Sequence, residues 1–256
     1  MIGAIAGDVI GSVFEHRNVR SKDFPLFSPG SRFTDDTVLT LALAEALMEG
    51  ADTAGTFRLY HALYPRAGYG QWFRNWARTP GMGPYCSYGN GSAMRVSAAA
   101  WVFDDEAAVL EAARASAAVT HDHPEGIKGA QAVALAVFLA RKGEGKGDIL
   151  ATVAENFGYD LGFTLDEIRP AYRFDASCQG SVPQALVAFR EGTDFEDTIR
   201  GAISIGGDSD TIACMAGAVA GAFYGGVPET IDREVRARLD ARLRGLLERF
   251  EARFVL

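Results

Sequence analysis

The stretch of sequence that decides the fold is TIACMAGAVAGAFYGG, residues Thr211–Gly226. It is apolar and consists almost wholly of small residues, and glycine recurs inside what reads as a helix. Each glycine inside a helix costs roughly 0.5–1 kcal/mol relative to alanine. That cost makes sense where neighbouring helices approach very closely, and ordinary tight core packing is the alternative explanation. The stretch is too short to span a membrane.

Helical periodicity also dominates the rest of the chain. Apolar residues between Val38 and Leu47 recur at helical spacing, and Gly50 is suited to end that helix. Runs of alternating β-branched residues, typical of strands, are nearly absent. The sequence therefore predicts an all-α, compact fold with a single domain over residues 1–256. Further helices are expected over Ser92–Phe103, Glu106–Val119, Pro124–Arg141, Val182–Arg190, Phe195–Ser204 and Arg233–Phe250, with Pro124 and Pro183 near the start of theirs.

The composition narrows the class of protein. Of 256 residues, 48% are hydrophobic and 23% are charged, which suits one sizeable core. The net charge of −8 argues against a nucleic-acid groove, because phosphate backbones need a basic surface. A monomer is the default expectation.

The cysteines and the N-terminal segment bear on where in the cell the protein is expected to be located. Cys86, Cys178 and Cys214 form no CxxC pair, so neither a disulfide framework nor a cysteine zinc site is indicated. The apolar start MIGAIAGDVIGSVFE lacks a basic residue and is interrupted by Asp8, which argues against a signal peptide. No segment reaches the apolar length of a membrane helix. We therefore expect a cytoplasmic protein without a membrane partner.

Two short stretches place pairs of aspartates beside threonine: RFTDDT at Arg32–Thr37 and GGDSDT at Gly206–Thr211. Neighbouring carboxylates repel each other unless a positive group lies between them. Both stretches precede predicted helices, so capping of free N–H groups is the structural explanation. One cap accounts for one aspartate or threonine in each stretch and leaves the others unexplained.

Taken together, the two stretches suggest a metal site. Four carboxylates and several hydroxyls form a set of hard oxygen ligands, which suits Mg²⁺, Mn²⁺ or Ca²⁺ rather than zinc or copper. Such a set can bridge two ions about 3.5–4 Å apart. Gly206 and Gly207 would let the backbone bend so that both aspartates of the second stretch face the same way. Whether the two stretches meet in space is a question for the structure.

The chain resembles the ADP-ribosylglycohydrolase superfamily, which includes dinitrogenase reductase activating glycohydrolases and ADP-ribosyl-acceptor hydrolases. The resemblance runs from residue 3 to about residue 225. It rests on five landmarks that match in order, which together are highly specific, although any one alone would be weak. Its landmarks, in chain order, are AGDVIGSVFE (Ala6–Glu15), FTDDT (Phe33–Thr37), SYGNGSAMR (Ser87–Arg95), THDHPEG (Thr120–Gly126) and GGDSDTIA (Gly206–Ala213).

The resemblance implies an orthogonal bundle of helices with a binuclear Mg²⁺ or Mn²⁺ centre. It also implies hydrolysis of the bond between C1″ of the terminal ribose and an acceptor, with release of ADP-ribose. By position, the metal ligands of the family fall on Thr34, Asp35, Asp36, Asp208, Asp210 and Thr211.

The catalytic assignments follow from the same resemblance. Glu15 matches the glutamate that approaches the scissile bond, and we expect it to act as general acid/base or to position water. Asp36 is assigned a catalytic role in addition to metal ligation. Without the resemblance, Glu15 would be taken for a solvent-facing residue at the end of the first helix.

The substrate-binding assignments fall on two loops. Ser87, Tyr88, Gly89 and Asn90 precede a helix, where free N–H groups can receive a pyrophosphate, and the family uses this loop for ADP-ribose. An ordinary glycine-rich turn is the alternative. His121 matches a histidine of the substrate pocket in the acceptor-hydrolase branch, whereas His123 is assigned to the surface or a cap.

Three other features have weaker assignments. FDASCQG, Phe174–Gly180, is similar to a stretch of short bacterial members and is expected to line the pocket, with Cys178 packed rather than nucleophilic. The aromatic cluster Tyr69–Arg78 is expected to border the entrance or to belong to the core. Arg95 is expected to be a buried partner of an acidic group.

The sequence thus predicts a Mg²⁺- or Mn²⁺-dependent ADP-ribosyl hydrolase of the short bacterial type. Its substrate is expected to be an ADP-ribosylated protein or a small conjugate such as O-acetyl-ADP-ribose. Two alternatives stay open: a non-catalytic ADP-ribose-binding or structural protein of the same fold, and a Mg²⁺-dependent phosphohydrolase. The acceptor linkage is not determined by these motifs.

Overall fold

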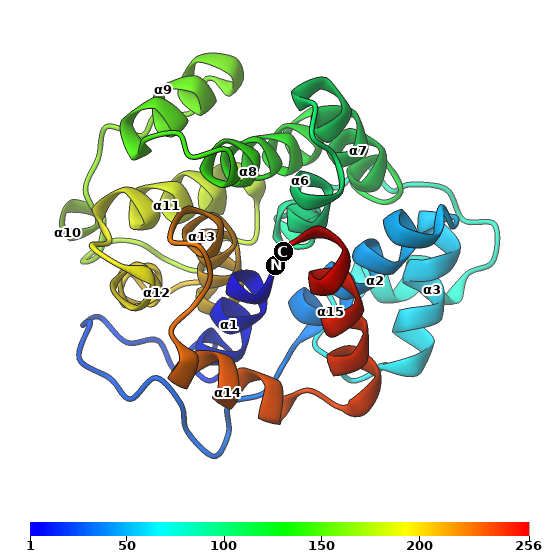
Figure 1. Ribbon diagram of the computed structural model, residues 1–256, viewed down its shortest axis with the longest axis horizontal. Helices are drawn as coiled ribbons and strands as arrows, with labels where there is room; N and C mark the ends of the chain where they lie inside the picture. The colour runs from blue at the N-terminus through cyan, green and yellow to red at the C-terminus, as the bar shows by residue number, and fades with distance from the viewer. Residues whose placement is uncertain (256) are drawn as a thin grey trace.

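Helices joined by loops make up the part of the chain that the computed structural model describes, residues 1–255, and no strand occurs in it (Figure 1). This confirms the all-α prediction. The helices run in several directions around a central pair, α1 and α13. The elements are α1 (Ile2–Gly11), α2 (Asp35–Glu49), α3 (Thr53–Leu63), α4 (Gln71–Arg78), α5 (Gly91–Met94), the 3₁₀ turn η1 (Val96–Ala98), α6 (Ala99–Val102), α7 (Glu106–Ala118), α8 (Pro124–Arg141), α9 (Lys146–Phe157), α10 (Leu165–Ile168), α11 (Cys178–Glu191), α12 (Phe195–Ser204), α13 (Ser209–Phe223), α14 (Glu229–Arg238) and α15 (Ala241–Phe254).

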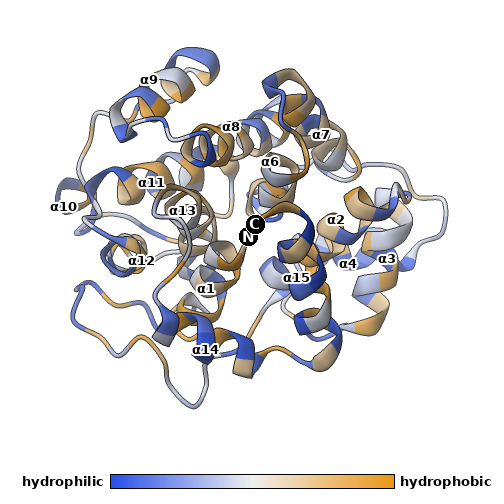
Figure 2. Ribbon diagram, viewed as in Figure 1, coloured by the Kyte–Doolittle hydropathy of each residue, from blue (hydrophilic) through white to orange (hydrophobic). Residues whose placement is uncertain are grey.

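The centre of the fold is the small-residue helix α13. Every residue from Ser209 to Ala222 is buried, and the helix is surrounded by α1, α8, α11 and α12. Figure 2 shows apolar residues concentrated on these inner helices and polar residues on the outer helices, such as α14. No helix within the described residues is both long enough and apolar enough to cross a bilayer.

The glycines of α1 and α13 allow the two backbones to touch. A Cβ on Gly3 would lie 2.2 Å from the carbonyl oxygen of Gly217, and a Cβ on Gly7 would lie 2.0 Å from that of Ala213. The reverse contact is equally tight, because a Cβ on Gly217 would lie 2.3 Å from the carbonyl oxygen of Gly3. The two helices lie side by side in Figure 1. Close approach of helices, the first of the two explanations for the small residues, therefore holds at these glycines, and the burial of the whole segment Ser209–Ala222 shows tight core packing as well.

Substituting Gly217 with alanine is expected to destabilise the protein by about 1–3 kcal/mol, because the added methyl group overpacks a backbone contact that cannot move. Chemical denaturation of both proteins measures this difference. Gly245→Ala in α15 is the matched control, since a Cβ there meets nothing within 4 Å. We expect that control to stabilise the protein by about 0.5–1 kcal/mol. Equal stability of Gly217→Ala and wild type would contradict the close contact.

The helix predicted over Arg233–Phe250 is wrong as a single element. The chain forms α14 and α15 instead, because Leu239 adopts an extended conformation and is buried. Asp240 then caps the new helix, accepting a hydrogen bond from the backbone N–H of Leu243 at 3.0 Å. Helical periodicity continues across this break, so the pattern of apolar residues does not reveal it.

Two further boundaries differ from the prediction. The helix expected over Ser92–Phe103 is divided into α5, η1 and α6, with the break at Arg95. Pro183 lies inside α11 rather than near its start, because the helix begins at Cys178, where the Ser177 hydroxyl accepts from the N–H of Gly180 at 3.1 Å. The proline ring leaves the carbonyl of Gln179 without its helical partner. The helices over Pro124–Arg141 and Phe195–Ser204 have the predicted bounds.

One continuous cluster of buried apolar side chains runs through the described residues, from Met1 to Phe250. The single domain predicted over residues 1–256 stays a prediction, and residue 256 lies outside the described range. Cys86, Cys178 and Cys214 are all free thiols.

Candidate functional site

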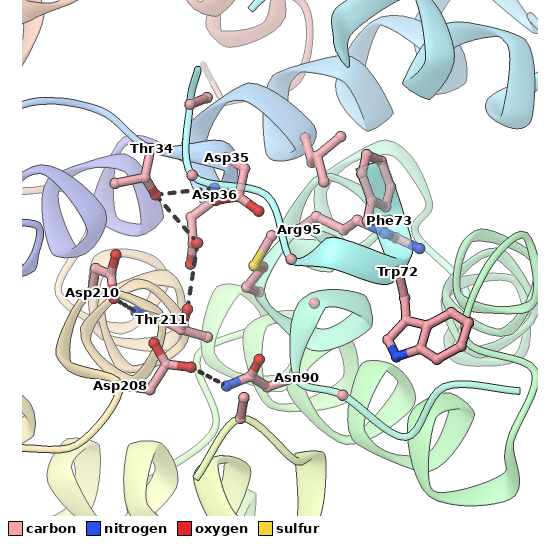
Figure 3. A pocket seen from close by; sticks show the side chains of 18 of the residues that line it. Thr34, Asp35, Asp36, Trp72, Phe73, Asn90, Arg95, Asp208, Asp210 and Thr211 are labelled. Atoms are coloured by element: carbon pink, nitrogen blue, oxygen red, sulfur yellow. Dashed lines mark hydrogen bonds between the residues drawn. The ribbon is translucent and has the colours of Figure 1, made fainter. Parts of the chain in front are cut away.

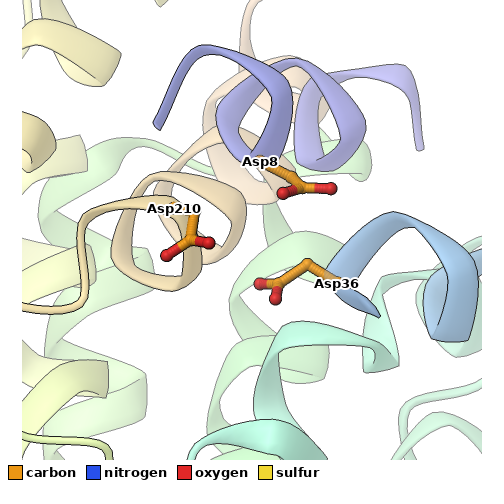
Figure 4. Close-up of side chains that lie close together, drawn as sticks. All are labelled: Asp8, Asp36 and Asp210. Carbon is orange, nitrogen blue, oxygen red and sulfur yellow. The ribbon is translucent and has the colours of Figure 1, made fainter. Parts of the chain in front are cut away.

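Three helices from the two ends of the chain bring aspartates together at one point. Asp8 lies in the middle of α1, Asp36 in the first turn of α2, and Asp210 in the first turn of α13. Figure 4 shows these three carboxylates facing one another across the gap between the helices. The two acidic stretches of the sequence therefore meet in space.

Asp8 ties α1 to the start of α2. Its carboxylate accepts hydrogen bonds from the backbone N–H of Thr34 at 2.9 Å and of Thr37 at 3.1 Å, and from the hydroxyls of both threonines. Asp8 is completely buried. With four donors around it, this carboxylate fixes the position of Asp35 and Asp36 as well as contributing charge.

One carboxylate oxygen of Asp36 has no hydrogen-bond partner among residues 1–255. Its Oδ2 accepts weak hydrogen bonds at 3.4 Å from the hydroxyls of Thr34 and Thr211, which belong to the two separate acidic stretches. Its Oδ1 is buried and has no hydrogen-bond partner. A buried carboxylate oxygen without a partner carries a large desolvation penalty, so a ligand is expected to complete it.

The turn before α13 places Asp208 and Asp210. Gly206 and Gly207 have φ of 69° and 76°, the left-handed conformation that favours glycine. A Cβ on Gly207 would also lie 2.5 Å from the ring of Tyr172. The bend that the sequence suggested is therefore present, and it directs both aspartates toward the same pocket.

The carboxylates form two overlapping groups. In one, oxygens of Asp8, Asp36 and Asp210 lie within 4.8 Å of one another; in the other, oxygens of Glu15, Asp208 and Asp210 do so. Asp210 belongs to both groups. Two neighbouring acidic triads that share one carboxylate are compatible with a binuclear metal site.

The electrostatics of the cluster point to a missing positive charge. Burial and, next, repulsion from Asp8 raise the pKa of Asp35 to about 8. Burial also raises the pKa values of Asp36 and Asp210 well above the ordinary range, and nearby carboxylates add to this. No lysine or arginine among residues 1–255 forms a hydrogen bond or ion pair with Asp8, Asp36 or Asp210.

The donor set fits hard divalent cations. It consists of carboxylate and hydroxyl oxygens without a histidine or cysteine, which suits Mg²⁺ or Mn²⁺. The unsatisfied Asp36 oxygen and the raised pKa values are the observations that support this fit. Which ion binds is a matter for measurement.

Glu15 lies at the edge of the cluster, on the segment that follows α1. Partial burial and then repulsion from Asp208 raise the pKa of its carboxyl group. The side chain of Asn18 holds this segment against the Gly206–Gly207 turn. Its amide donates to the carbonyls of Phe14, Glu15 and Gly207 at 2.7–3.0 Å, and its Oδ1 accepts from the N–H of Gly207 at 2.9 Å.

A pocket of about 330 Å³ opens next to the carboxylates. Figure 3 shows the acidic residues on one side and the loop carrying Asn90 and the helix carrying Trp72 on the other. All six residues predicted as metal ligands line the pocket, as does Glu15. The structure thus brings these side chains together, while their roles stay predictions.

The predicted substrate loop forms one wall of this pocket. Ser87, Gly89 and Asn90 line it, and the Asn90 amide donates to Asp208 at 2.8 Å, which links the loop to the acidic cluster. Tyr88 does not line the pocket. Its side chain is 52% exposed, and its ring packs edge-on against His123.

The FDASCQG segment lies against the substrate loop. The backbone of Ala176 accepts from the N–H of Asn90 at 2.8 Å, and the backbone of Tyr88 accepts from that of Cys178 at 2.9 Å. Phe174 and Ala176 line the pocket. The Cys178 thiol is buried and its pKa rises to about 12 because of burial, so it is packed rather than nucleophilic.

Aromatic side chains border the pocket on the side of α4. Trp72 and Phe73 line it, and the indole of Trp72 is 68% exposed. Trp72 stacks on Tyr85 with 6.4 Å between the ring centroids. His121 also lines the pocket and is buried. Part of the aromatic cluster Tyr69–Arg78 therefore borders the pocket, which was the first of the two expectations. Phe73 and Trp76 are buried, as the second expectation, a place in the core, required.

Sequence reasoning missed Asp8 as a member of the acidic cluster. Its signal was present in the sequence as the single charged residue of an apolar helix, where an ionised group needs partners. Arg95 was also misjudged. Among residues 1–255 no carboxylate forms an ion pair with its buried guanidinium, which instead donates to the Ser116 carbonyl and the Thr120 hydroxyl, each at 2.9 Å.

Known proteins resemble this chain along most of its length. The model of the ADP-ribosylglycohydrolase family matches residues 1–255. The ADP-ribosylhydrolase ARH3 of Homo sapiens is 30% identical, over 90% of this chain and 86% of its own length. The ADP-ribosyl-[dinitrogen reductase] glycohydrolase of Rhodospirillum rubrum is 27% identical, over 94% of this chain and 93% of its own.

A solved structure agrees in fold. A chain described as an ADP-ribosylglycohydrolase-related protein complex superposes with a TM-score of 0.72 at 28% identity, covering 97% of this chain and 95% of that one. The family match, the relatives and the shared fold confirm the resemblance that the sequence motifs indicated. The chain belongs to the ADP-ribosylglycohydrolase family.

Proposed function

We propose that this protein is a Mg²⁺- or Mn²⁺-dependent hydrolase that cleaves the bond between C1″ of ADP-ribose and an acceptor, releasing ADP-ribose. The observation that carries the proposal is the pair of acidic triads that share Asp210 and include Glu15 at their edge. A carboxyl group beside a site for the sugar is the usual machinery of glycosidic hydrolysis.

Glu15 is the group proposed to handle the proton. In the forward step, the oxygen of a water molecule forms a bond to C1″ while the C1″–acceptor bond breaks. One proton of the water passes to the Glu15 carboxylate, and the protonated Glu15 then gives that proton to the departing acceptor atom, which restores the carboxylate. Burial raises the pKa of Glu15 above its ordinary value, which is the direction that favours a group that must both take up and release a proton.

The other residues are proposed to bind and orient the substrate. Thr34, Asp35, Asp36, Asp208, Asp210 and Thr211 would hold two divalent ions, which supply positive charge for gripping the ribose hydroxyls and for polarising water. Ser87, Gly89 and Asn90 face the pocket, where their polar groups can hold the diphosphate. Tyr88 and His121 complete the predicted substrate-binding set, with Tyr88 outside the pocket wall.

The relatives support this proposal through their names, which describe hydrolysis of ADP-ribosyl groups. Substrates are proposed to be ADP-ribosylated proteins or small conjugates such as O-acetyl-ADP-ribose. A monomer in the cytoplasm remains the proposed form and location.

A substrate panel tests the proposal. Arginine-, serine- and acetyl-linked ADP-ribose would be incubated with the protein, with and without Mg²⁺ or Mn²⁺, and both free ADP-ribose and phosphate would be quantified. Metal-dependent release of ADP-ribose from at least one linkage is the expected result, and the ranking identifies the acceptor. Release of phosphate alone would favour a phosphohydrolase, and binding of ADP-ribose with no product would favour a non-catalytic protein.

Asn18→Ala is expected to lower kcat by about ten- to a hundredfold, because small displacements of reacting groups cost that much. The substitution frees the Glu15 segment from the Gly206–Gly207 turn. Steady-state kinetics on the best substrate of the panel give kcat and KM separately.

The control for this prediction is Asn156→Ala, which alters an exposed asparagine in α9. It should leave kcat unchanged. Thermal denaturation should show both variants folded, since Asn18 is itself an exposed residue. If Asn18→Ala were as active as wild type, the hydrogen bonds of the Asn18 side chain would have no role in positioning Glu15.

A further inference from the structure

Arg95 is a buried cation whose position the proposed chemistry does not explain. Its side chain is 0% exposed, and its guanidinium lies 4.4 Å from the centre of the Phe57 ring. The Nη2 group donates to the carbonyl of Ser116 and to the hydroxyl of Thr120. Burial lowers the pKa of this guanidinium only to about 10, so it remains charged at neutral pH and can act solely as a donor.

The hydroxyl of Thr120 links the guanidinium of Arg95 to the imidazole of His121. Thr120 Oγ1 and His121 Nδ1 lie 2.6 Å apart, and Thr120 is completely buried. The oxygen already accepts a hydrogen bond from Arg95 at 2.9 Å. Two side chains offer an acceptor to this hydroxyl: His121 Nδ1, in the short contact at 2.6 Å, and the phenol oxygen of Tyr85. If Nδ1 carried a proton, the hydroxyl proton would have to turn to Tyr85, because a buried hydroxyl left without an acceptor is costly.

The other nitrogen of the imidazole faces the substrate loop. Nε2 lies 3.5 Å from where a Cβ on Gly89 would be and 3.2 Å from where one on Gly91 would be. His121 lines the pocket together with these glycines. Burial lowers the pKa of His121 well below its ordinary value, and the Arg95 charge adds to this, so the ring is neutral. A neutral imidazole presents either an N–H or a lone pair at Nε2, depending on its tautomer.

We propose that Arg95 and Thr120 are positioning residues that hold His121 in its Nε2–H tautomer, so that an N–H donor faces the pocket at the Gly89–Gly91 loop. An N–H there attracts the oxygens of a bound diphosphate or ribose, whereas a lone pair repels them. The identity of that oxygen-rich ligand as ADP-ribose rests on the proposed function. The tautomer itself does not, because it is a property of the free protein.

The test uses the ring nitrogens of His121 as a spectroscopic signature. The chain has four histidines, so a long-range ¹H–¹⁵N correlation spectrum of the uniformly labelled protein is simple, and a His121→Gln variant assigns the signal. In the ligand-free wild type, we expect the ¹⁵N shifts of a neutral ring protonated at Nε2. A neutral ring protonated at Nδ1 would overturn the proposal.

Variants of Thr120 test the relay. Thr120→Val removes the hydroxyl at nearly constant volume, and Thr120→Ser keeps it. We expect the valine variant to lose the preference for Nε2–H and to bind ADP-ribose about three- to tenfold more weakly, the worth of one hydrogen bond. The serine variant should restore both. An unchanged tautomer in Thr120→Val would show that the hydroxyl does not direct it.

Tyr85→Phe is the matched control for the neighbouring phenol. The Tyr85 ring lies 5.7 Å from that of His121, and burial raises its pKa to about 12, so it stays neutral. Because Arg95 and Thr120 remain in place, this variant should keep the Nε2–H tautomer, and loss of that tautomer would assign the effect to Tyr85 instead. If the wild type shows the Nε2–H signature but binds no ADP-ribose by calorimetry, the proposed function fails while the tautomer assignment stands.

Discussion

Glu15→Gln is expected to reduce turnover by about 10²–10⁴-fold, the usual contribution of a general acid/base, while ADP-ribose still binds. The amide has nearly the same size as the carboxyl group, so the segment held by Asn18 keeps its position. It cannot exchange the proton that hydrolysis requires. Turnover is measured on the best substrate of the panel, and affinity for ADP-ribose is measured by calorimetry. A loss of turnover without a loss of affinity shows that Glu15 acts in the chemical step and not in binding.

A glutamate far from the acidic cluster in the chain provides the control. Glu144 is exposed in the loop between α8 and α9, and Glu144→Gln makes the same chemical change there. We expect it to leave turnover and affinity unchanged. A fully active Glu15→Gln enzyme would refute the assignment of Glu15.

The second large effect concerns metal ions and thermal stability. Saturating Mg²⁺ is expected to raise the melting temperature by about 5–10 °C, because an ion at a hundred times its Kd adds roughly 2.7 kcal/mol to a domain of this size. The physical reason is that the ions offset the repulsion among Asp36, Asp210 and their neighbours. Differential scanning fluorimetry with and without a chelator measures the shift.

The shift should depend on pH in a definite direction. The pKa of Asp35 is about 8 in the folded protein, above its ordinary value of 3.8, so the metal-free folded state binds more protons than the unfolded state between these limits. Without metal, stability is therefore greatest at the acidic end of this window and falls as pH rises toward 8. Bound ions remove this loss, so we expect a larger metal shift at pH 8 than at pH 6.5.

Asp210→Asn is the decisive variant, because it removes the carboxylate shared by both triads. Without metal, the variant should melt at the same temperature as the wild type or higher, since a repelling charge is gone. Its response to Mg²⁺ should be abolished. A Mg²⁺ shift equal to that of the wild type would place the ions elsewhere.

A structural feature of this protein could be predicted from the sequence where a local pattern of residues specifies it. Helical periodicity and the two acidic stretches are local patterns, and they predicted the all-α class and a set of candidate ligands. That the two stretches form one site was implied only by the family resemblance. The break at Leu239 was missed, because an extended residue between two helices leaves the periodicity almost unchanged. Asp8 was missed because its partners, Thr34 and Thr37, are identified only when α1 lies against α2.

The contacts of individual side chains were the feature that the sequence predicted least well. Arg95 reads as one half of an ion pair, yet its contacts are a carbonyl, a hydroxyl and an aromatic ring. Tyr88 matches a family motif but does not line the pocket; its ring packs against His123, and its backbone carbonyl accepts from the N–H of Cys178.

The contact between α1 and α13 has a consequence for biosynthesis. Gly3 leaves the ribosome well before its partner Gly217, which follows only after roughly 10–40 s at ordinary translation rates. Until then, the face of α1 that packs on α13 has no native cover. Nascent chains of this protein are therefore expected to depend on chaperones that shield the first helix until translation is nearly complete.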